Sequence, residues 1–409
     1  MRRGAPRATG RSAAAIARSR GAVLSTLVLA ALVAACSGPI LANSPEPSAK
    51  PPTPSPAPSV PPDPQPLVFP RDDGPHDRLT EWWYYTGHLL AADGRHFGFE
   101  AVVFRAERGG APVTWASHLA LTDESGNRFL YAQRAQVGPL ADQSPRGPGG
   151  QPVGFALAVA GFDPANPAGA THDPWILAGS GGKDAIKATL ATEEAAAAGG
   201  AFGLDLKLTS TKPPALHGGA GWIDFGAAGS SYYYSRTRMG LAGALTLDGA
   251  PLQVTGEAWF DHQWGDFISV GGGGWDWFAV NLADGTDLTL SLVRAADGSH
   301  PLVYGTLVAA DGSAVNLDST AFTLTPDAAR TWTSPLTGST YPAGWTISIP
   351  GQGLSIDLSP TVAAQELDTR ATTGVVYWEG SEVVRATRNG VPVAGQAYVE
   401  LTGYTAGTR

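Results

Sequence analysis

The chain has 409 residues, of which 43% are hydrophobic and 9% aromatic, enough for sizeable cores and too much for a disordered protein. At roughly 100–200 residues per domain, this length favours two folded domains. The 52 glycines and 33 prolines argue against a helical bundle, and the single cysteine excludes a disulfide framework. A net charge of −9 with scattered basic residues argues against nucleic acid as a partner, because such proteins neutralise phosphate with basic patches.

The N-terminus has the pattern of an export signal. Six arginines and no acidic residue accompany an apolar stretch over residues 22–35, which is too short to span a bilayer comfortably and suits a signal-peptide core. The stretch ends in Val-Ala-Ala-Cys36, which resembles a bacterial lipobox, where the cysteine is lipidated. We therefore expect residues 1–36 to be a lipoprotein signal peptide. The protein would then be exported and lipid-anchored through Cys36 to the outer face of a bacterial membrane.

Residues 37–66 form a proline-rich segment with 12 prolines. Proline removes backbone donors and favours polyproline II, so this segment is predicted to be a disordered linker. At about 3.1 Å per residue it could hold the body up to roughly 90 Å from the membrane.

The body from residue 67 onward is predicted to be all-β. Short apolar runs such as residues 96–104 and 288–293 alternate with turns. Asp-Gly and Asn-Gly pairs are strong hairpin signals, because both residues tolerate positive φ. Such pairs begin at residues 93, 248, 284, 297, 311 and 389. Their spacing indicates antiparallel barrels or sandwiches and not βαβ units.

A domain boundary is predicted near residue 235, giving an N-terminal domain over 67–235 and a C-terminal domain over 236–409. Before it, a Gly-rich stretch at 218–229 indicates a long loop, and after it a fresh hairpin begins. One stretch, residues 185–198, looks helical and ends in two glycines, but its first half also alternates as a strand does. Both assignments stay open.

Three aromatic segments stand out. If residues 81–88 form a strand, Trp82, Tyr84, Thr86 and His88 share one face, and Glu81, Trp83 and Tyr85 the other. In the second segment, Phe260, His262 and Trp264 lie opposite Trp259, Asp261 and Gln263. The third places Trp275, Asp276 and Trp277 after four glycines, without the helix start that a phosphate-binding loop needs. Such clusters either pack a core or line a ligand cavity.

These segments resemble the carotenoid 1,2-hydratase (hydroxyneurosporene synthase) family, which also contains exported lipocalin-like proteins labelled predicted hydrolases. The resemblance rests on EWWYYTGHL at 81–89, YYYSRTRM at 232–239, GEAWFDHQWGD at 256–266, YWEG at 377–380 and YVELTGY at 398–404. The matches cover the whole body in order. They imply two lipocalin-like antiparallel β-barrel domains that bind apolar ligands at or between them.

Hydration of an alkene needs a proton donor, a water and stabilisation of a carbocation. A buried carboxylic acid can donate the proton, and Trp faces can stabilise the cation. Asp261, His262 and Asp276 are the candidate catalytic residues; His262 and Trp264 match the family's DHxWG-type segment, and Asp276 is the nearest candidate for its acid/base residue. The candidate ligand-binding residues are Trp82, Trp83, Tyr84, Tyr85, His88, Trp259, Gln263, Trp264, Trp275 and Trp277.

Three functions stay open at this point. The first is a tethered protein that binds or carries an isoprenoid or lipid-like molecule, and the second is a hydro-lyase that adds water to an isoprenoid double bond. The third is a hydrolase, although the Gly-x-Ser-x-Gly elbow of serine hydrolases is absent. The eight histidines occur singly, without the spacing of a metal hydrolase, so no metal and no cofactor is predicted.

Overall fold

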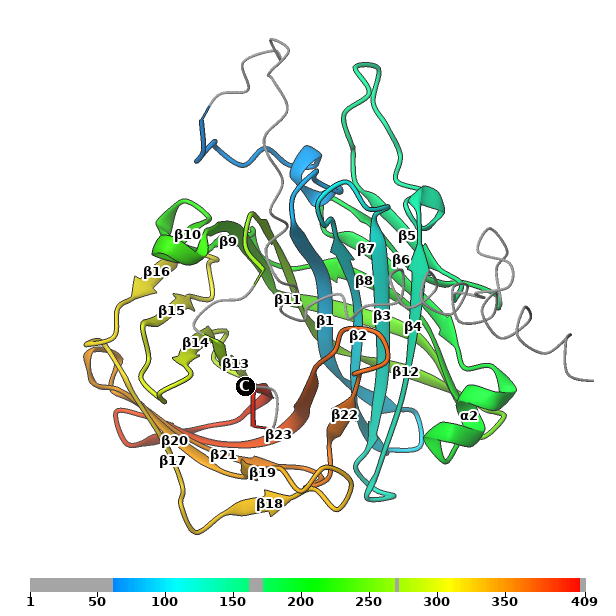
Figure 1. Ribbon diagram of the computed structural model, residues 1–409. Helices are drawn as coiled ribbons and strands as arrows, with labels where there is room; N and C mark the ends of the chain where they lie inside the picture. The colour runs from blue at the N-terminus through cyan, green and yellow to red at the C-terminus, as the bar shows by residue number, and fades with distance from the viewer. Residues whose placement is uncertain (1–61, 162–171, 269–271, 405–409) are drawn as a thin grey trace, which may run out of the picture. The chain divides into compact units, whose positions relative to one another are not determined.

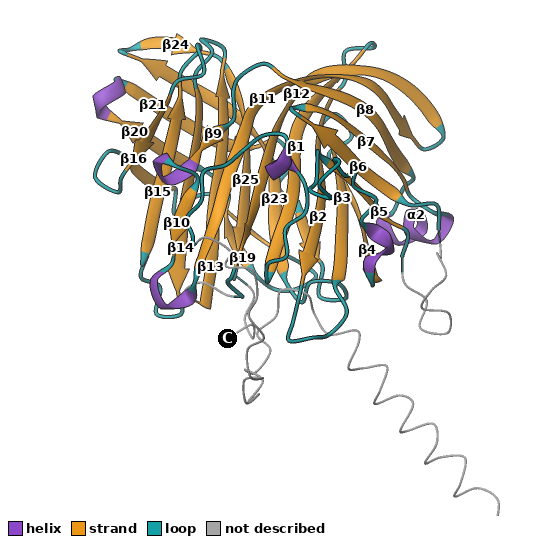
Figure 2. Cartoon of the chain, turned by 90° about the horizontal axis from the view of Figure 1, so that it is seen from above, coloured by secondary structure: helices purple, strands orange, loops and turns teal. Residues whose placement is uncertain are grey.

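The computed structural model describes residues 62–161, 172–268 and 272–404, which are mainly β-strand (Figures 1 and 2). The predicted signal peptide, its Cys36 and the proline-rich linker up to residue 61 lie outside the described residues. Two barrel-like antiparallel sheets confirm the predicted all-β, lipocalin-like class. In the described part of the chain, no helix is both long and apolar enough for a membrane span.

The first sheet has 12 strands, coloured blue to green in Figure 1. Its order is β4-β3-β2-β1-β12-β11-β8-β7-β6-β5, and β9 and β10 pair with β11. The strands are β1 (Thr80–Ala91), β2 (His96–Ala106), β3 (Thr114–Asp123), β4 (Arg128–Val137), β5 (Phe155–Val159), β6 (Trp175–Ser180), β7 (Lys183–Thr189), β8 (Phe202–Ser210), β9 (Ala215–Leu216), β10 (Trp222–Asp224), β11 (Ser230–Leu247) and β12 (Ala250–Gly265).

The second sheet has 11 strands in the order β16-β15-β14-β13-β25-β23-β21-β20-β17, with β22 and β24 paired to β23. A separate two-stranded sheet joins β18 to β19. The strands are β13 (Gly272–Leu282), β14 (Asp287–Ala295), β15 (Leu302–Val308), β16 (Ala314–Leu317), β17 (Thr323–Pro326), β18 (Thr331–Thr333), β19 (Thr340–Pro342), β20 (Trp345–Ile349), β21 (Leu354–Pro360), β22 (Glu366–Asp368), β23 (Val376–Arg388), β24 (Val391–Val393) and β25 (Gly395–Thr402).

The six Asp-Gly and Asn-Gly pairs named above each connect two paired antiparallel strands, as predicted. At Asp248-Gly249 and Asn389-Gly390 both residues have positive φ. This is the conformation of a two-residue type I′ turn, whose twist matches that of the strands it joins. Local sequence therefore determines where these hairpins turn.

One boundary differs from the sequence expectation, and the structure decides one assignment that the sequence left open. Residue 235 lies inside β11, and the chain passes from the first sheet to the second after Gly265, so the change of sheet does not fall near 235. Both readings of residues 185–198 hold in part, because β7 ends at Thr189 and helix α2 (Thr192–Ala198) follows. Gly199 ends α2 in the left-handed conformation with φ of 78°.

Strands β1 and β12 pair with each other and present two different faces. Trp83 and Tyr85 of β1 join Phe260 of β12 in the core of the first sheet, as the alternation predicted. On the opposite face, Tyr84 and Trp259 belong to a separate aromatic cluster shared with the second sheet. The same two strands therefore contribute to the first core and to the contact between the sheets.

A buried ion-pair cluster around Asp287 also joins the two sheets. Lys212 Nζ lies 2.7 Å from Asp287 Oδ2, and Arg238 Nη2 lies 2.7 Å from Asp287 Oδ1. Thr237 and Asn281 donate further hydrogen bonds to the same carboxylate. Asp287 is fully buried, and its charge is balanced by Arg238 of β11 and by Lys212 of the segment that follows β8.

Gly98 of β2 provides a direct test of the packing between the sheets. A Cβ at this position would lie 2.5 Å from Tyr398 Oη and 2.7 Å from Ser381 Cβ, both in the second sheet. We expect Gly98→Ala to destabilise the protein by about 1–3 kcal/mol in urea unfolding, because overpacking forces the sheets apart. Gly240→Ala on β11 is the matched control, since its added methyl group meets no atom of the described residues within 4 Å and should cost little. An equal loss in both variants would contradict this close contact.

Candidate functional site

A cavity of about 980 Å³ lies between the two sheets. One wall comes from β1, β2, β11 and β12, and the other from β13, β14, β15, β23 and β25. The side chains that matter for its chemistry are Trp82, Tyr84, Glu100, Phe104, Tyr233, Asp261, Gln263, Trp275, Trp277, Arg294, Tyr304, Tyr377 and Glu400. Apolar walls with a few converging polar groups are typical of ligand sites.

Glu100 of β2 is a buried carboxylic acid in the wall of the cavity. Burial raises its pKa to about 8, although a hydrogen bond from Tyr377 works in the opposite direction. Tyr377 Oη donates to Glu100 Oε1 at 2.7 Å, and the other oxygen, Oε2, is buried and has no hydrogen-bond partner among the described residues. Glu100 is therefore mainly protonated at neutral pH and has an oxygen free to carry the proton.

Asp261 of β12 has a different environment in the same cavity. Tyr233 Oη donates to its Oδ2 at 2.5 Å, and Trp259 Nε1 donates to its Oδ1 at 2.6 Å. Ser235 also hydrogen-bonds Oδ1 and in turn lies 2.6 Å from His217 Nε2. Burial raises the pKa of Asp261 to about 6, and these hydrogen bonds limit the rise. Asp261 is thus mainly ionised where Glu100 is mainly protonated.

Further acids lie near these two groups. Glu400 of β25 lines the cavity, and burial raises its pKa to about 7. Glu379 of β23 is fully buried, and its pKa is raised well above the usual range by burial and by the charges of Glu100 and Glu400. This group of acids therefore favours protonated forms, since like charges and burial both oppose ionisation.

Aromatic rings line the cavity beside these acids. Trp82 and Tyr84 come from β1, and Trp275 and Trp277 from β13. The Tyr84 and Trp277 rings meet edge to face with centroids 5.4 Å apart. Indole faces are the strongest side-chain partners for a cation, so the cavity can stabilise positive charge on an apolar ligand.

Six of the residues predicted for the site line this cavity: Trp82, Tyr84, Asp261, Gln263, Trp275 and Trp277. Two others lie outside the lining. Trp259 donates to Asp261, and His88 places its ring 5.3 Å from that of Tyr398. Burial lowers the pKa of His88 to about 4, so it is neutral at physiological pH.

The remaining predicted residues point away from the cavity because neighbouring residues of a strand face opposite sides. Trp83, Tyr85 and Trp264 lie in the core of the first sheet, and the His262 ring packs between Trp83 and Trp264. Asp276 alternates with Trp275 and Trp277, and it contacts Tyr404 and Arg294. The structure therefore brings Asp261 to the cavity and not its two predicted catalytic companions, His262 and Asp276.

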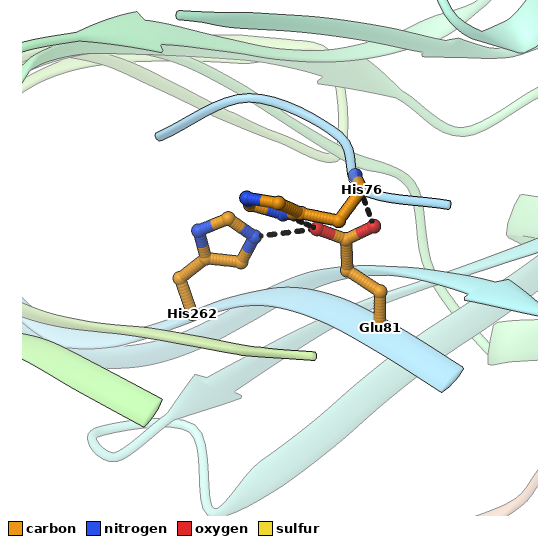
Figure 3. Close-up of side chains that lie close together, drawn as sticks. All are labelled: His76, Glu81 and His262. Atoms are coloured by element: carbon orange, nitrogen blue, oxygen red, sulfur yellow. Dashed lines mark hydrogen bonds and ion pairs between the residues drawn. The ribbon is translucent and has the colours of Figure 1, made fainter. Parts of the chain in front are cut away.

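His262 belongs instead to a second cluster, with His76 and Glu81 (Figure 3). His76 lies in the segment before β1, Glu81 on β1 and His262 on β12. His76 Nδ1 is 2.8 Å and His262 Nε2 is 2.9 Å from the same oxygen, Glu81 Oε1. Burial alone would raise the pKa of Glu81, but the charge of His76 and hydrogen bonds from both histidines lower it.

The sequence profile described as AttH-like matches residues 60–404. The chain belongs to the AttH-like family. A search of curated proteins finds no match. Among solved structures, an AttH from Nitrosomonas europaea is 30% identical with a TM-score of 0.69, over 85% of this chain and 100% of that chain.

A second solved structure similar to this AttH-like chain is kievitone hydratase from Nectria haematococca. It is 18% identical with a TM-score of 0.57, and the match covers 83% of this chain and 94% of that chain. At this identity the similarity shows the fold. The resemblance to carotenoid hydratases is thus supported at the level of the AttH-like family and a fold shared with a hydratase.

Several cavity residues of this AttH-like chain were not singled out from its sequence. Tyr233, Tyr377 and Glu400 lie within the segments that carried the family resemblance, without an assigned role. Glu100 lies in the middle of the apolar run 96–104, where a charged side chain is costly unless it is paired or functional. This acidic residue within an apolar run is the sequence feature that could have indicated the site.

Proposed function

We propose that this AttH-like protein is a hydro-lyase that adds water to a carbon–carbon double bond of an isoprenoid-type ligand held between the two sheets. The observation that carries the proposal is Glu100, a buried acid with a pKa of about 8 in an aromatic cavity. Such an acid keeps its proton at neutral pH and can transfer it to an alkene. The hydratase fold of the fungal neighbour supports the same reaction class.

In this reaction Glu100 gives its proton to one alkene carbon, and the other carbon becomes a carbocation. Trp82, Trp275 and Trp277 offer π-faces to that charge, worth about 2 kcal/mol when desolvated. Water then adds to the cation and loses a proton to the Asp261 carboxylate, which acts as general base. One water is added, and exchange with solvent returns the proton from Asp261 to Glu100.

The two carboxyl groups lie on strands that flank β1. Glu100 pairs with Thr86 of β1, and Asp261 pairs with Tyr84, two residues away on the same face. Strand spacing and rise then separate their Cα atoms by roughly 12 Å. Both side chains line the cavity, so a ligand bound there can contact both carboxyl groups.

The pH dependence of the reaction follows from these two acids. Glu100 acts when protonated, so activity is lost as pH rises through its pKa of about 8. Asp261 acts when ionised, so activity is lost as pH falls through its pKa of about 6. We expect a bell-shaped profile of kcat/KM with a maximum between about pH 6 and 8. A rate that keeps rising above pH 9 would rule out a protonated carboxyl donor.

The proposal is tested by incubating the protein with linear carotenes and prenylated phenols in oxygen-18 water. The expected product gains one water that carries the heavy oxygen, as read by mass spectrometry. The aromatic lining alone favours a second candidate function, binding or carrying an apolar ligand without chemistry. Saturable quenching of Trp emission by these compounds with no labelled product would support the carrier and overturn the hydro-lyase.

We also propose that the protein is exported and anchored through Cys36, on the strength of the lipobox-like sequence. The mature protein from its bacterial host should then begin at residue 36 and carry a diacylglyceryl group, as measured by intact mass. Cys36→Ala should accumulate as unprocessed precursor. A wild-type mature protein that begins at any other residue would contradict the anchor.

A further inference from the structure

The cluster of His76, Glu81 and His262 lies on the side of β12 away from the cavity. Asp261 and His262 are neighbours on β12, so they face opposite sides of the strand, one toward the cavity and one toward the cluster. The side chains of Glu81 and His262 are fully buried, and that of His76 is 20% exposed. The cluster is therefore a separate, enclosed site that the hydration mechanism does not use.

Three potential metal ligands converge at this site. His76 Nδ1, Glu81 Oε1 and His262 Nε2 all lie within 4.8 Å of one another (Figure 3). Zinc binds imidazole nitrogens and carboxylate oxygens at about 2.0–2.2 Å, which places tetrahedral ligand atoms about 3.3 Å apart. To reach that geometry, the two N–O distances of 2.8 and 2.9 Å need to open by about half an ångström, and the two histidine nitrogens, which lie within 4.8 Å of each other, need to adjust to the same spacing.

The second ring nitrogen of each histidine faces an oxygen atom. His76 Nε2 lies 3.6 Å from Asp72 Oδ1, and His262 Nδ1 lies 3.4 Å from Tyr234 Oη. Metal-binding histidines typically direct their other nitrogen to a carboxylate or another oxygen, which sets the tautomer and the ring orientation. Stacking of the His76 ring on Trp264, at a centroid distance of 4.0 Å, further restricts its orientation.

The charge of Glu81 also favours a cation here. Within the described residues its only ion-pair partners are the two histidines, which are neutral unless protonated. By contrast, Asp72 and Asp73 in the preceding segment pair with Arg71 and Arg236. A fully buried carboxylate without a permanent cation is costly, and a bound divalent ion would balance it.

We propose that His76, Glu81 and His262 bind a divalent transition-metal ion of the zinc class. Two ligands come from paired strands of the first sheet and the third from the segment before β1. The ion therefore fastens this segment to β1 and β12 and stabilises the folded state. Sequence spacing does not reveal the site, because Glu81 and His262 are brought together by the pairing of β1 with β12, and His76 by the segment that precedes β1.

The test uses the full chain, first freed of metal with a chelator, and Co²⁺ or Zn²⁺ alone. We expect one equivalent of Co²⁺ to bind and give the visible absorption of a tetrahedral nitrogen–oxygen site, and Zn²⁺ to displace it and raise the melting temperature. His76→Ala and Glu81→Gln should each weaken binding at least about 100-fold, since even loss of an outer hydrogen-bond partner typically costs 10–100-fold. His96→Ala, an exposed histidine outside the site, should bind like wild type.

Two results would overturn the site. If metal-free wild-type protein gives no cobalt spectrum at a large excess of Co²⁺, the cluster is only a hydrogen-bond network. If both variants, shown to be folded by circular dichroism, bind as tightly as wild type, the ion binds elsewhere. These readouts do not depend on hydration activity, so they stand apart from the test of the proposed function.

Discussion

Replacing Glu100 with glutamine is expected to lower hydration by about 10²–10⁴-fold, the usual contribution of a positioned general acid. Glutamine keeps the size of the side chain and can still accept the hydrogen bond from Tyr377, but it has no proton of suitable acidity to transfer. Ligand affinity, measured by quenching of Trp emission, should change little. The loss should therefore appear in kcat with little change in binding.

Glu382 provides the matched control for this variant. It is also buried, with a strongly raised pKa caused mainly by burial, but it does not line the cavity. Glu382→Gln should keep wild-type turnover. Equal rates for both variants, or a Glu100→Gln protein that loses activity only in proportion to unfolded protein, would remove Glu100 from the mechanism.

Removing the Asp287 side chain should produce the largest loss of stability. Asp287→Ala leaves Lys212 and Arg238 without their shared carboxylate, and the Lys212 side chain is only 5% exposed. Breaking a buried pair from one side costs about 3–5 kcal/mol, because the remaining charge stays buried. Urea unfolding followed by Trp emission measures the difference.

The contrasting substitution is Arg146→Ala, which removes an ion pair with Asp142 at the surface. Exposed pairs of this kind contribute less than about 1 kcal/mol, so this variant should unfold close to wild type. Similar free energies of unfolding for Asp287→Ala and Arg146→Ala would mean that the Asp287 cluster does not hold the sheets together.

Much of the fold could be predicted because local chemistry determines it. Turn pairs such as Asp248-Gly249 adopt positive φ at a low cost, and strand alternation placed Trp83 and Tyr84 on opposite faces of β1. The change of sheet could not be located, because a Gly-rich stretch looks like a boundary. In the structure that stretch includes β10, which pairs with residues 230–232 at the start of β11.

The sequence could predict site residues only where they lie close together on one strand. The clustering of aromatic and polar residues in short segments identified Asp261 and Trp277 as candidates, and both line the cavity. It could not tell which face of each strand the second sheet covers, so His262 and Asp276 were chosen with them. Glu100 lines the same cavity as these residues because of the order of the strands in the sheet, and the spacing of residues in the sequence does not show that order.

The cavity wall is divided between two sheets, and each sheet keeps its own hydrophobic core. The proposed ligand site lies in the interface between them, here called the seam. Substitutions along the seam can change which molecules fit without disturbing either hydrogen-bond ladder. In a single barrel, substitutions that alter the specificity of an internal pocket also affect the core around it. Here the residues that line the cavity and the residues that form each core are largely different, so the two effects are separated. A lineage with this architecture can diversify its substrates at a small cost in stability, and directed evolution should begin with seam positions such as Phe104 and Tyr304.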